Sequence, residues 1–104
     1  MEIEITEQNF DELLNGGKPL MVDFYADWCG PCRHIMPFVE QIAEAYADKA
    51  VVGRCNVDDN GDIAQRFGIM SIPAVLYFKD GKLANTIVGG VSKQQLEDAL
   101  KAIL

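Results

Sequence analysis

Cysteine, histidine and long apolar runs are all scarce in this chain. Its 104 residues include three cysteines and one histidine. So few cysteines, in an odd number, exclude a disulfide scaffold, and the chain offers few ligands for a metal ion. No stretch approaches the ~20 apolar residues that a membrane-spanning helix needs. Residues 1–20 hold no basic region followed by an apolar one, so we expect a cytoplasmic protein with reduced thiols.

Positive charge is also scarce. The 9 lysines and arginines face 16 aspartates and glutamates, which gives a formal net charge of −7 at pH 7. Such a surface repels phosphate backbones and anionic lipids. We therefore expect neither nucleic acid nor a membrane among the partners.

Apolar residues are plentiful enough to form a core. They make up 49% of the chain, whose length is close to the commonest domain size. We expect one domain over residues 1–104 that folds without the help of a disulfide. Nothing in the sequence demands more than a monomer.

The apolar pattern predicts alternating strands and helices. We expect strands at residues 2–5, 20–26, 51–58, 74–78 and 82–89. We expect helices over residues 7–15, from about Cys29 to residue 49, over 61–67 and over 93–104. This order indicates an α/β fold, with a central mixed β-sheet that has a mostly parallel core, an antiparallel C-terminal hairpin and helices on both faces.

Local signals mark the element ends. The expected helix N-caps are Thr6, Asn60 and Ser92. Ser92 and Gln95 together form a capping-box pattern, and Asp80-Gly81 predicts a hairpin turn. Pro37 lies inside the second helical pattern and predicts a kink or an early break there.

Residues 28–32 read Trp-Cys-Gly-Pro-Cys, and this cysteine pair could be a structural clip, a metal clasp or a redox-active disulfide. A bridge across so short a loop restricts the unfolded chain little, so it stabilises the fold little. A closed zinc site needs four ligands, and only Cys55 and His34 could add to the pair. The redox function fits best, because the pair follows the carboxyl end of a buried strand, where open α/β sheets bind ligands.

A helix that begins near Cys29 gives the two cysteines different chemistry. Residues three apart lie on one helix face with about 5–6 Å between their Cβ atoms, so a disulfide forms with little rearrangement. The helix N-terminus stabilises an anion, which predicts that the Cys29 thiol ionises easily. Cys32 lies one turn further in and should stay a thiol until it attacks Cys29. Pro31 suits the first turn, where its missing N–H is not needed.

Asp23 interrupts the apolar run at residues 20–26. If its carboxyl is buried, the pKa rises, because burial disfavours the charged form. Such a carboxyl, a few residues before the cysteine pair, could take the proton from Cys32 at the moment of attack. The alternative is that Asp23 points outward at the end of its strand.

The segments "DFYADWCGPCRHIMPFVE", "GIMSIPAVLYFKDGK" and "VGGVSKQQL" resemble the thioredoxin family, in the family's order and over essentially the whole chain. The resemblance implies the thioredoxin fold and a protein-disulfide reductase with a redox-active disulfide and no bound cofactor. By position, Cys29 matches the attacking cysteine and Cys32 the resolving cysteine. Asp23 matches the buried carboxyl that assists proton transfer. The resemblance also implies thioredoxin reductase as the electron donor and oxidised proteins as substrates.

Further residues match the apolar patch that contacts partners in this family. Pro73 matches a proline whose peptide bond is cis, which leaves the Ile72 backbone free to pair with an extended substrate. The implied substrate-binding residues are Trp28, Gly30, Pro31, Ile72, Pro73, Val88, Gly89 and Gly90. From pattern alone, Gly89-Gly90 is a turn before the last helix and Trp28 is a core residue.

The chain departs from the family's commonest pattern at a few positions. Arg54 stands where the family often has lysine, and a guanidinium does not release its proton, so its effect on Asp23 should be electrostatic. Tyr25 replaces a frequent tryptophan, and Ser71 a frequent glycine. Cys55 is an unmatched third thiol, which we expect to be buried and inert. The alternative is a thiol open to regulatory oxidation.

Three classes of function remain for these residues. Gly30-Pro31 adds no cation that would over-stabilise the Cys29 thiolate, which favours a reductase over a disulfide oxidase or isomerase of an exported compartment. A non-redox binding module that uses the apolar patch would need neither both cysteines nor Asp23. The sequence therefore predicts a general protein-disulfide reductase.

Overall fold

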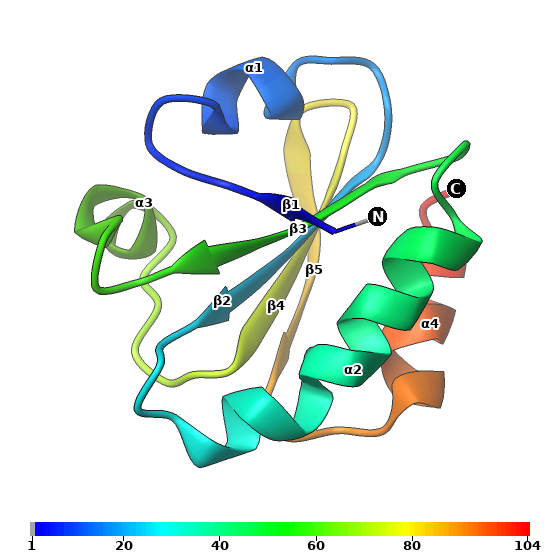
Figure 1. Cartoon of the computed structure of the whole chain (residues 1–104). Helices are drawn as coiled ribbons and strands as arrows, with labels where there is room; N and C mark the ends of the chain where they lie inside the picture. The colour runs from blue at the N-terminus through cyan, green and yellow to red at the C-terminus, as the bar shows by residue number, and fades with distance from the viewer. Residues whose placement is uncertain (1) are drawn as a thin grey trace.

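The structure, a computed structural model, describes residues 2–104. Its strands and helices follow the expected order (Figure 1). The elements are β1 (Ile3–Glu4), α1 (Phe10–Leu14), β2 (Leu20–Tyr25), α2 (Gly30–Ala45), β3 (Val51–Asn56), α3 (Gly61–Arg66), β4 (Ala74–Lys79), β5 (Lys82–Val88) and α4 (Lys93–Lys101). The predicted α/β architecture is confirmed.

The strands form one five-stranded mixed sheet in the order β1-β3-β2-β4-β5. The pairs β1–β3 and β3–β2 are parallel, and the pairs β2–β4 and β4–β5 are antiparallel. The antiparallel part is thus larger than the C-terminal hairpin predicted from sequence. One reason is that α3 has only six residues and rises about 9 Å. It is too short to carry the chain back along a strand of ~20 Å, so β4 starts from the end where β3 stops.

Helices cover both faces of the sheet, as expected. Helices α2 and α4 lie together on one face, and α1 and α3 lie on the other (Figure 1). Alternate residues of β2 point to opposite faces: Met21 packs into the core with Ile35 and Leu96, whereas Val22 and Phe24 pack into the other core. We call these two sides of the sheet the α2/α4 face and the α1/α3 face.

One helix start and one helix cap differ from the sequence prediction. Helix α1 begins at Phe10 rather than after Thr6, and Asn9 is its N-cap. The Asn9 carboxamide accepts a hydrogen bond from the Thr6 N–H at 2.7 Å, which holds residues 6–9 in a turn instead of a helix. Asn60 precedes α3 but its side chain does not cap it. Because Asn60 instead bonds the Glu7 N–H at 3.0 Å, it ties α3 to the N-terminal segment.

Other local predictions are confirmed. Ser92 caps α4, and Gln95 completes the capping box with its side chain. Asp80 and Gly81 both have positive φ values, 53° and 78°, as the tight turn between β4 and β5 requires. Helix α2 continues through Pro37, so the prediction of an early break in this helix is wrong.

Among residues 2–104, no helix is long and apolar enough to cross a membrane.

Candidate active site

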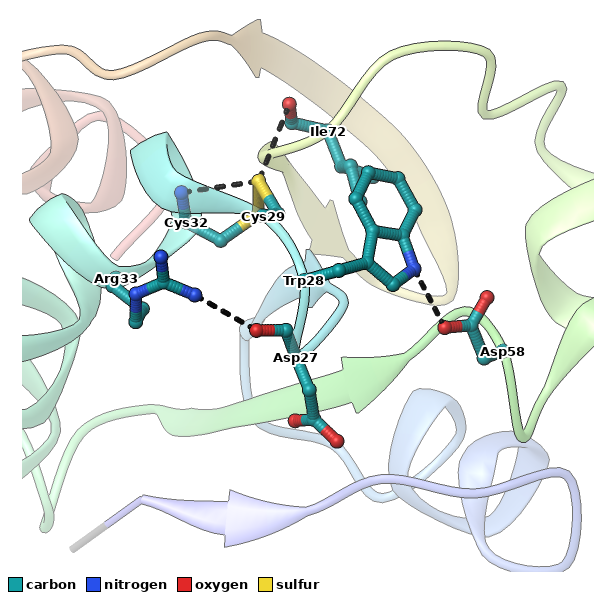
Figure 2. Close-up of a disulfide and its surroundings, with 7 residues drawn as sticks. All are labelled: Asp27, Trp28, Cys29, Cys32, Arg33, Asp58 and Ile72. Carbon is teal, nitrogen blue, oxygen red and sulfur yellow. Dashed lines mark hydrogen bonds between the residues drawn. A yellow bond between two sulfur atoms is a disulfide. The ribbon is translucent and has the colours of Figure 1, made fainter.

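A disulfide joins Cys29 to Cys32 where β2 leads into α2, with the two Cα atoms 5.3 Å apart. Cys29 is the N-cap of α2, and its Sγ accepts a hydrogen bond from the Cys32 N–H at 3.2 Å. The Ile72 carbonyl oxygen lies 3.8 Å from the same sulfur (Figure 2). The Cys29 sulfur therefore contacts two polar backbone groups, and one of them is an N–H of the helix end that has no partner within the helix.

The loop before the disulfide is fixed by side-chain contacts. The Arg33 guanidinium donates to the Asp27 carbonyl at 2.8 Å, and the Trp28 indole N–H donates to the Asp58 carboxylate at 2.9 Å (Figure 2). The Trp28 side chain is 70% exposed, so a core role for it is wrong. Sequence reasoning missed Asp58 as a partner of Trp28. The available signal was its position just after β3, at the same edge of the sheet as the cysteine pair.

The predicted partner-contacting segments meet around the disulfide. The Ile72–Pro73 peptide bond is cis, as expected. The Gly89 N–H donates to the Pro73 carbonyl at 2.8 Å, and Val88 pairs with Ala74 at the end of the sheet. A Cβ atom at Gly90 would lie 3.8 Å from Pro31, so this loop reaches the start of α2.

An apolar cavity of about 180 Å³ opens beside Trp28. Its other lining residues are Val57, Ile69, Met70 and Ile72. Met70 is 95% exposed. Sequence reasoning identified Trp28 and Ile72 but missed the other three. The signal for Met70 was an apolar residue in the loop that leads to the cis proline.

Asp23 lies on β2, on the α2/α4 face, and is 1% exposed, so the outward-pointing alternative is wrong. Its Oδ1 atom has no hydrogen-bond partner among residues 2–104. Burial raises the pKa of this carboxyl to about 7, the nearby Glu2 carboxylate also raises it, and Arg54 lowers it. No hydrogen bond of the described residues joins Asp23 to either cysteine. Asp23 is thus a buried carboxyl that titrates near neutral pH.

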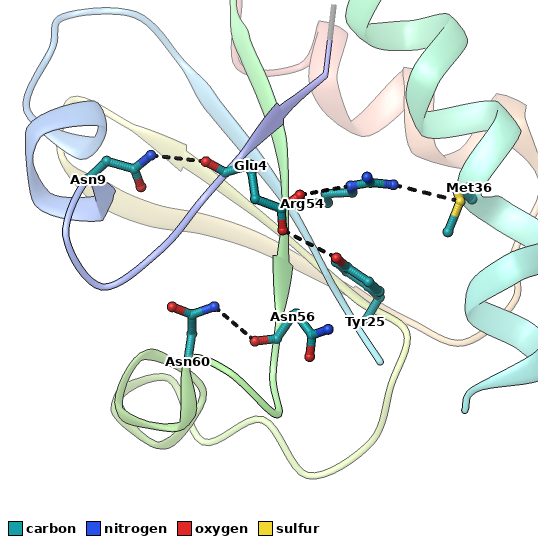
Figure 3. A network of polar contacts seen from close by, with 7 residues as sticks. All are labelled: Glu4, Asn9, Tyr25, Met36, Arg54, Asn56 and Asn60. Carbon is teal, nitrogen blue, oxygen red and sulfur yellow. Dashed lines mark hydrogen bonds and ion pairs between the residues drawn. The ribbon is translucent and has the colours of Figure 1, made fainter. Parts of the chain in front are cut away.

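Arg54 affects Asp23 only through its charge. Its Nε bonds the Glu4 carboxylate at 3.1 Å (Figure 3), and its guanidinium lies over the Tyr25 ring, 5.5 Å from the centroid. The Tyr25 hydroxyl donates to the other Glu4 oxygen at 3.2 Å. The expected electrostatic effect is confirmed, because the arginine is held by Glu4 rather than by Asp23.

Cys55 is fully buried on the α1/α3 face, as expected. Burial raises the pKa of its thiol to about 12, with smaller effects of Glu4 and Glu7. Over residues 2–104, no three histidine, cysteine, aspartate or glutamate side chains are grouped to hold a metal ion. Cys55 therefore has the properties of a packing residue rather than of a nucleophile.

Comparisons with known proteins agree with this geometry. The thioredoxin family model matches residues 1–102. The chain is 46% identical to a thioredoxin of Alicyclobacillus acidocaldarius, covering 96% of this chain and 95% of that one. It is 43% identical to thioredoxin 1 of Synechococcus elongatus (92% and 91% covered) and 44% identical to a thioredoxin of Porphyra purpurea (93% and 92% covered).

A solved structure gives the same result. The chain resembles, with a TM-score of 0.88 and 31% identity, a protein chain from a structure of "the thiol resolving mechanism in yeast mitochondrial 1-Cys peroxiredoxin via glutathione/thioredoxin systems". The likeness covers 97% of this chain and 94% of that chain. Together with the Cys29–Cys32 pair at the start of α2, these matches show that the chain belongs to the thioredoxin family and is a dithiol–disulfide reductase.

Proposed function

We propose that this reductase acts on a broad range of oxidised proteins, with Cys29 as the attacking cysteine, Cys32 as the resolving cysteine and Asp23 as the proton acceptor. One observation carries the assignment of the cysteines. The Cys29 sulfur accepts a hydrogen bond from the Cys32 N–H at the start of α2. Cys32 itself lies within the first turn of the helix and is only 1% exposed. A thiolate is therefore better stabilised at Cys29 than at Cys32.

The first step forms a mixed disulfide. The Cys29 thiolate attacks one sulfur of the substrate disulfide, so an S–S bond forms between enzyme and substrate while the substrate's own S–S bond breaks. The second substrate sulfur leaves as a thiolate and takes a proton from solvent. In the dithiol state the Ile72 carbonyl oxygen, 3.8 Å from the Cys29 sulfur, can accept a hydrogen bond from the Cys29 S–H group before it ionises and so orient that group.

The second step releases the product. The Cys32 thiol gives its proton to the Asp23 carboxylate, and the resulting thiolate attacks Cys29. The Cys29–Cys32 disulfide forms, the substrate's remaining sulfur leaves as a thiolate, and the substrate has gained two electrons that the enzyme lost. A base is most effective when its pKa lies near the working pH, and the pKa of Asp23 is raised to about 7.

The substrate lies across the apolar surface around the disulfide. The Ile72 backbone lies beside the Cys29 sulfur and pairs with an extended substrate strand. The cavity beside Trp28 and Met70 has a volume of about 180 Å³ and suits one apolar side chain of that strand. Backbone pairing and apolar contact select for little beyond an accessible disulfide, so the substrate range is broad. The proposed substrate-binding residues are Trp28, Gly30, Pro31, Ile72, Pro73, Val88, Gly89 and Gly90.

The proposal also covers the electron donor, the compartment, the oligomeric state and the cofactor. We take thioredoxin reductase as the electron donor, the cytoplasm as the compartment, a monomer as the working form, and no cofactor other than the Cys29–Cys32 disulfide. The net charge of −7 disfavours nucleic acid and anionic membranes as partners. Gly30-Pro31 places no cation between the cysteines, which fits a reductant.

Turnover of insulin disulfides by the dithiothreitol-reduced protein tests the roles of the cysteines. Cys29→Ser should reduce the rate to background, and Cys32→Ser should accumulate a mixed disulfide at Cys29, identified by mass spectrometry. Cys55→Ser is the matched control and should turn over like the parent. A mixed disulfide at Cys32 in the Cys29→Ser variant, formed at the parent's rate, would reverse the two roles.

The equilibrium reduction potential of the Cys29–Cys32 couple tests the direction of the reaction. We expect a value below the cytosolic glutathione poise of about −220 to −260 mV. A potential near the ~−120 mV of a strong oxidant would instead indicate a disulfide oxidase. Substrate binding with unchanged affinity in a Cys29→Ser/Cys32→Ser variant, without turnover by the parent, would indicate a non-redox binding module.

A further inference from the structure

Ionisable side chains gather on the α2/α4 face behind the active site. Glu4 on β1, Arg54 on β3 and Asp23 on β2 stand in register across three neighbouring strands. Arg54 is the central member of this row, and its guanidinium extends over the sheet toward Met36 of α2 (Figure 3). One cation therefore lies between carboxyl groups on both neighbouring strands.

Glu2 adds another carboxyl to this group. It lies two residues before Glu4, and alternation along an extended chain places both on the same face. Its Oε2 atom is buried and has no hydrogen-bond partner in the described part of the chain. A cavity of about 340 Å³ is lined by Glu2, Arg54, Glu40 and Glu44. Glu2 thus borders this cavity on the side of the sheet where Asp23 is buried.

The backbone fixes this position of Glu2. Gly53 on β3 pairs with Ile3, and a Cβ atom at Gly53 would lie 2.7 Å from the Ile3 carbonyl oxygen. Only glycine therefore allows the two strands to approach this closely. Because β1 is held against β3, the residue before it is held beside Arg54.

Arg54 forms no ion pair with Asp23 or Glu2 within the described residues, although its charge acts on both. Its only ion pair within residues 2–104 is with Glu4, at 3.1 Å, and its Nη1 lies 3.8 Å from the Met36 sulfur. Oδ1 of Asp23 and Oε2 of Glu2 remain without partners among the same residues. The buried Asp23 carboxyl and the half-buried Glu2 carboxyl thus share the field of one guanidinium that is already bonded to Glu4.

We propose that Glu2 is a positioning residue for the proton step of the reaction: its carboxylate opposes the charge of Arg54 at Asp23 and keeps Asp23 poised as a proton acceptor. The proposal rests on the role of Asp23 given above. Glu2 does not touch the cysteines or the substrate. It acts through Asp23 alone, by making a second negative charge on this face unfavourable.

The charges around Asp23 support this arrangement. Among them the Glu2 carboxylate raises the pKa of Asp23 and Arg54 lowers it, in addition to the effect of burial. The pKa of Glu2 is itself raised, chiefly by burial, with Arg54 opposing and Glu40 and Glu4 adding to the rise.

Other elements also present titratable groups on this side of the sheet. Tyr77 of β4 senses the charge of Asp23, and the pKa of its hydroxyl is raised by burial and by that charge. Helix α2 contributes Glu40 and Glu44 at the cavity and the Cys32 sulfur, which is held in the disulfide. None of these side chains adds a cation, and Arg54 is the group whose charge opposes Glu2 at Asp23, beside the larger effect of burial.

The test follows the Asp23 carboxyl carbon by NMR in the oxidised protein across pH 4–10. Glu2→Gln should move its titration midpoint to lower pH by about half a unit or more. Arg54→Gln should move it to higher pH. Glu44→Gln is the matched control, because it removes a carboxylate from the same cavity that does not act on Asp23. Glu2→Asp keeps the charge, so its Asp23 midpoint should lie close to that of the parent.

The pH profile of insulin reduction gives the second readout. The acid limb of the profile should move in the same direction as the midpoint in each variant. A merely structural role of Glu2 would lower stability but leave both the midpoint and the limb in place. An unchanged midpoint in Glu2→Gln, or one equal to that of Glu44→Gln, would overturn the proposal. The NMR titration needs no turnover, so it separates the two proposals. If the parent had no reductase activity but Glu2→Gln still lowered the Asp23 midpoint, only the proposed function would be refuted.

Discussion

On the α1/α3 face the rings of Phe10, Phe67 and Phe78 meet edge to face, with centroids between 5.2 and 5.7 Å apart. On the α2/α4 face the same sheet buries Asp23 with one oxygen unpartnered. Aromatic contacts of the first kind stabilise a fold, whereas a buried carboxyl without full hydrogen bonding destabilises it. Both faces contain an apolar core that stabilises the fold, and the α2/α4 face in addition buries the carboxyl group of Asp23.

The thiols repeat this contrast. Cys55 belongs to the apolar α1/α3 core, where burial raises its pKa to about 12. Cys29 is 5% exposed, hardly more than Cys55, but its sulfur accepts a hydrogen bond from the Cys32 N–H at the start of α2. Burial alone therefore does not make a thiol inert. The orientation of backbone dipoles around it decides whether a thiolate is stabilised.

The largest expected effect concerns the reactivity of these thiols. In the reduced protein at pH 7, iodoacetamide should alkylate Cys29 more than a thousandfold faster than Cys55, because a thiol with a pKa near 12 is almost never ionised at that pH. Peptide mass spectrometry over time measures both rates. In guanidinium chloride the two rates should become similar. Equal rates in the folded protein would remove the contrast between the two faces.

The next effect concerns stability and its pH dependence. The pKa of Asp23 is about 7 in the folded protein and about 3.9 in an unfolded chain. The folded state thus holds a proton that the unfolded state releases, and the stability this gives is complete below pH ~4 and is lost as the pH rises through 7. Asp23→Asn should be more stable than the parent by ~4 kcal/mol at pH 8, with the difference vanishing near pH 4.

Guanidinium chloride unfolding of the oxidised protein measures this difference. Phe24→Leu is the matched control, since Phe24 is the next residue of β2 and points into the apolar core. Phe24→Leu should lower the free energy of unfolding by about 1–2 kcal/mol at every pH, because the cavity it leaves contains no group that titrates. If the free energies of unfolding of the parent and of Asp23→Asn changed with pH in parallel, Asp23 would not be a buried carboxyl that titrates in this range.

The smallest effect compares the arginines of the two faces. Arg66 pairs with Asp11 at 2.9 Å on the surface, and its guanidinium lies 5.2 Å from the ring centroids of Phe10 and Phe67. Arg66→Gln should lower the free energy of unfolding by less than ~1 kcal/mol. It should not move the NMR midpoint of Asp23, in contrast to Arg54→Gln. A shift in that midpoint would mean that charge on the apolar face also reaches the proton acceptor.

Several features were readable before the structure because they depend on neighbours in sequence. The start of α2 at Cys29, the Ser92–Gln95 capping box and the Asp80-Gly81 turn follow from local backbone preferences. The start of α1 was missed because the Asn9 side chain bonds the Thr6 N–H and competes with the helix. Motif matching supplied the cis bond at Pro73, for which the apolar pattern gave no signal.

The sequence by itself determined the α/β class, the place of the redox pair and the burial of Cys55, because hydrophobic period and helix-end chemistry act over a few residues. Tertiary structure decided the direction of β4, the groove at Met70 and the neighbours of Asp23. Glu2 and Arg54 are 52 positions apart in the chain and meet only because β1 lies beside β3. Electrostatic effects on a buried carboxyl depend on such distances through space, and these exist only once the sheet has formed.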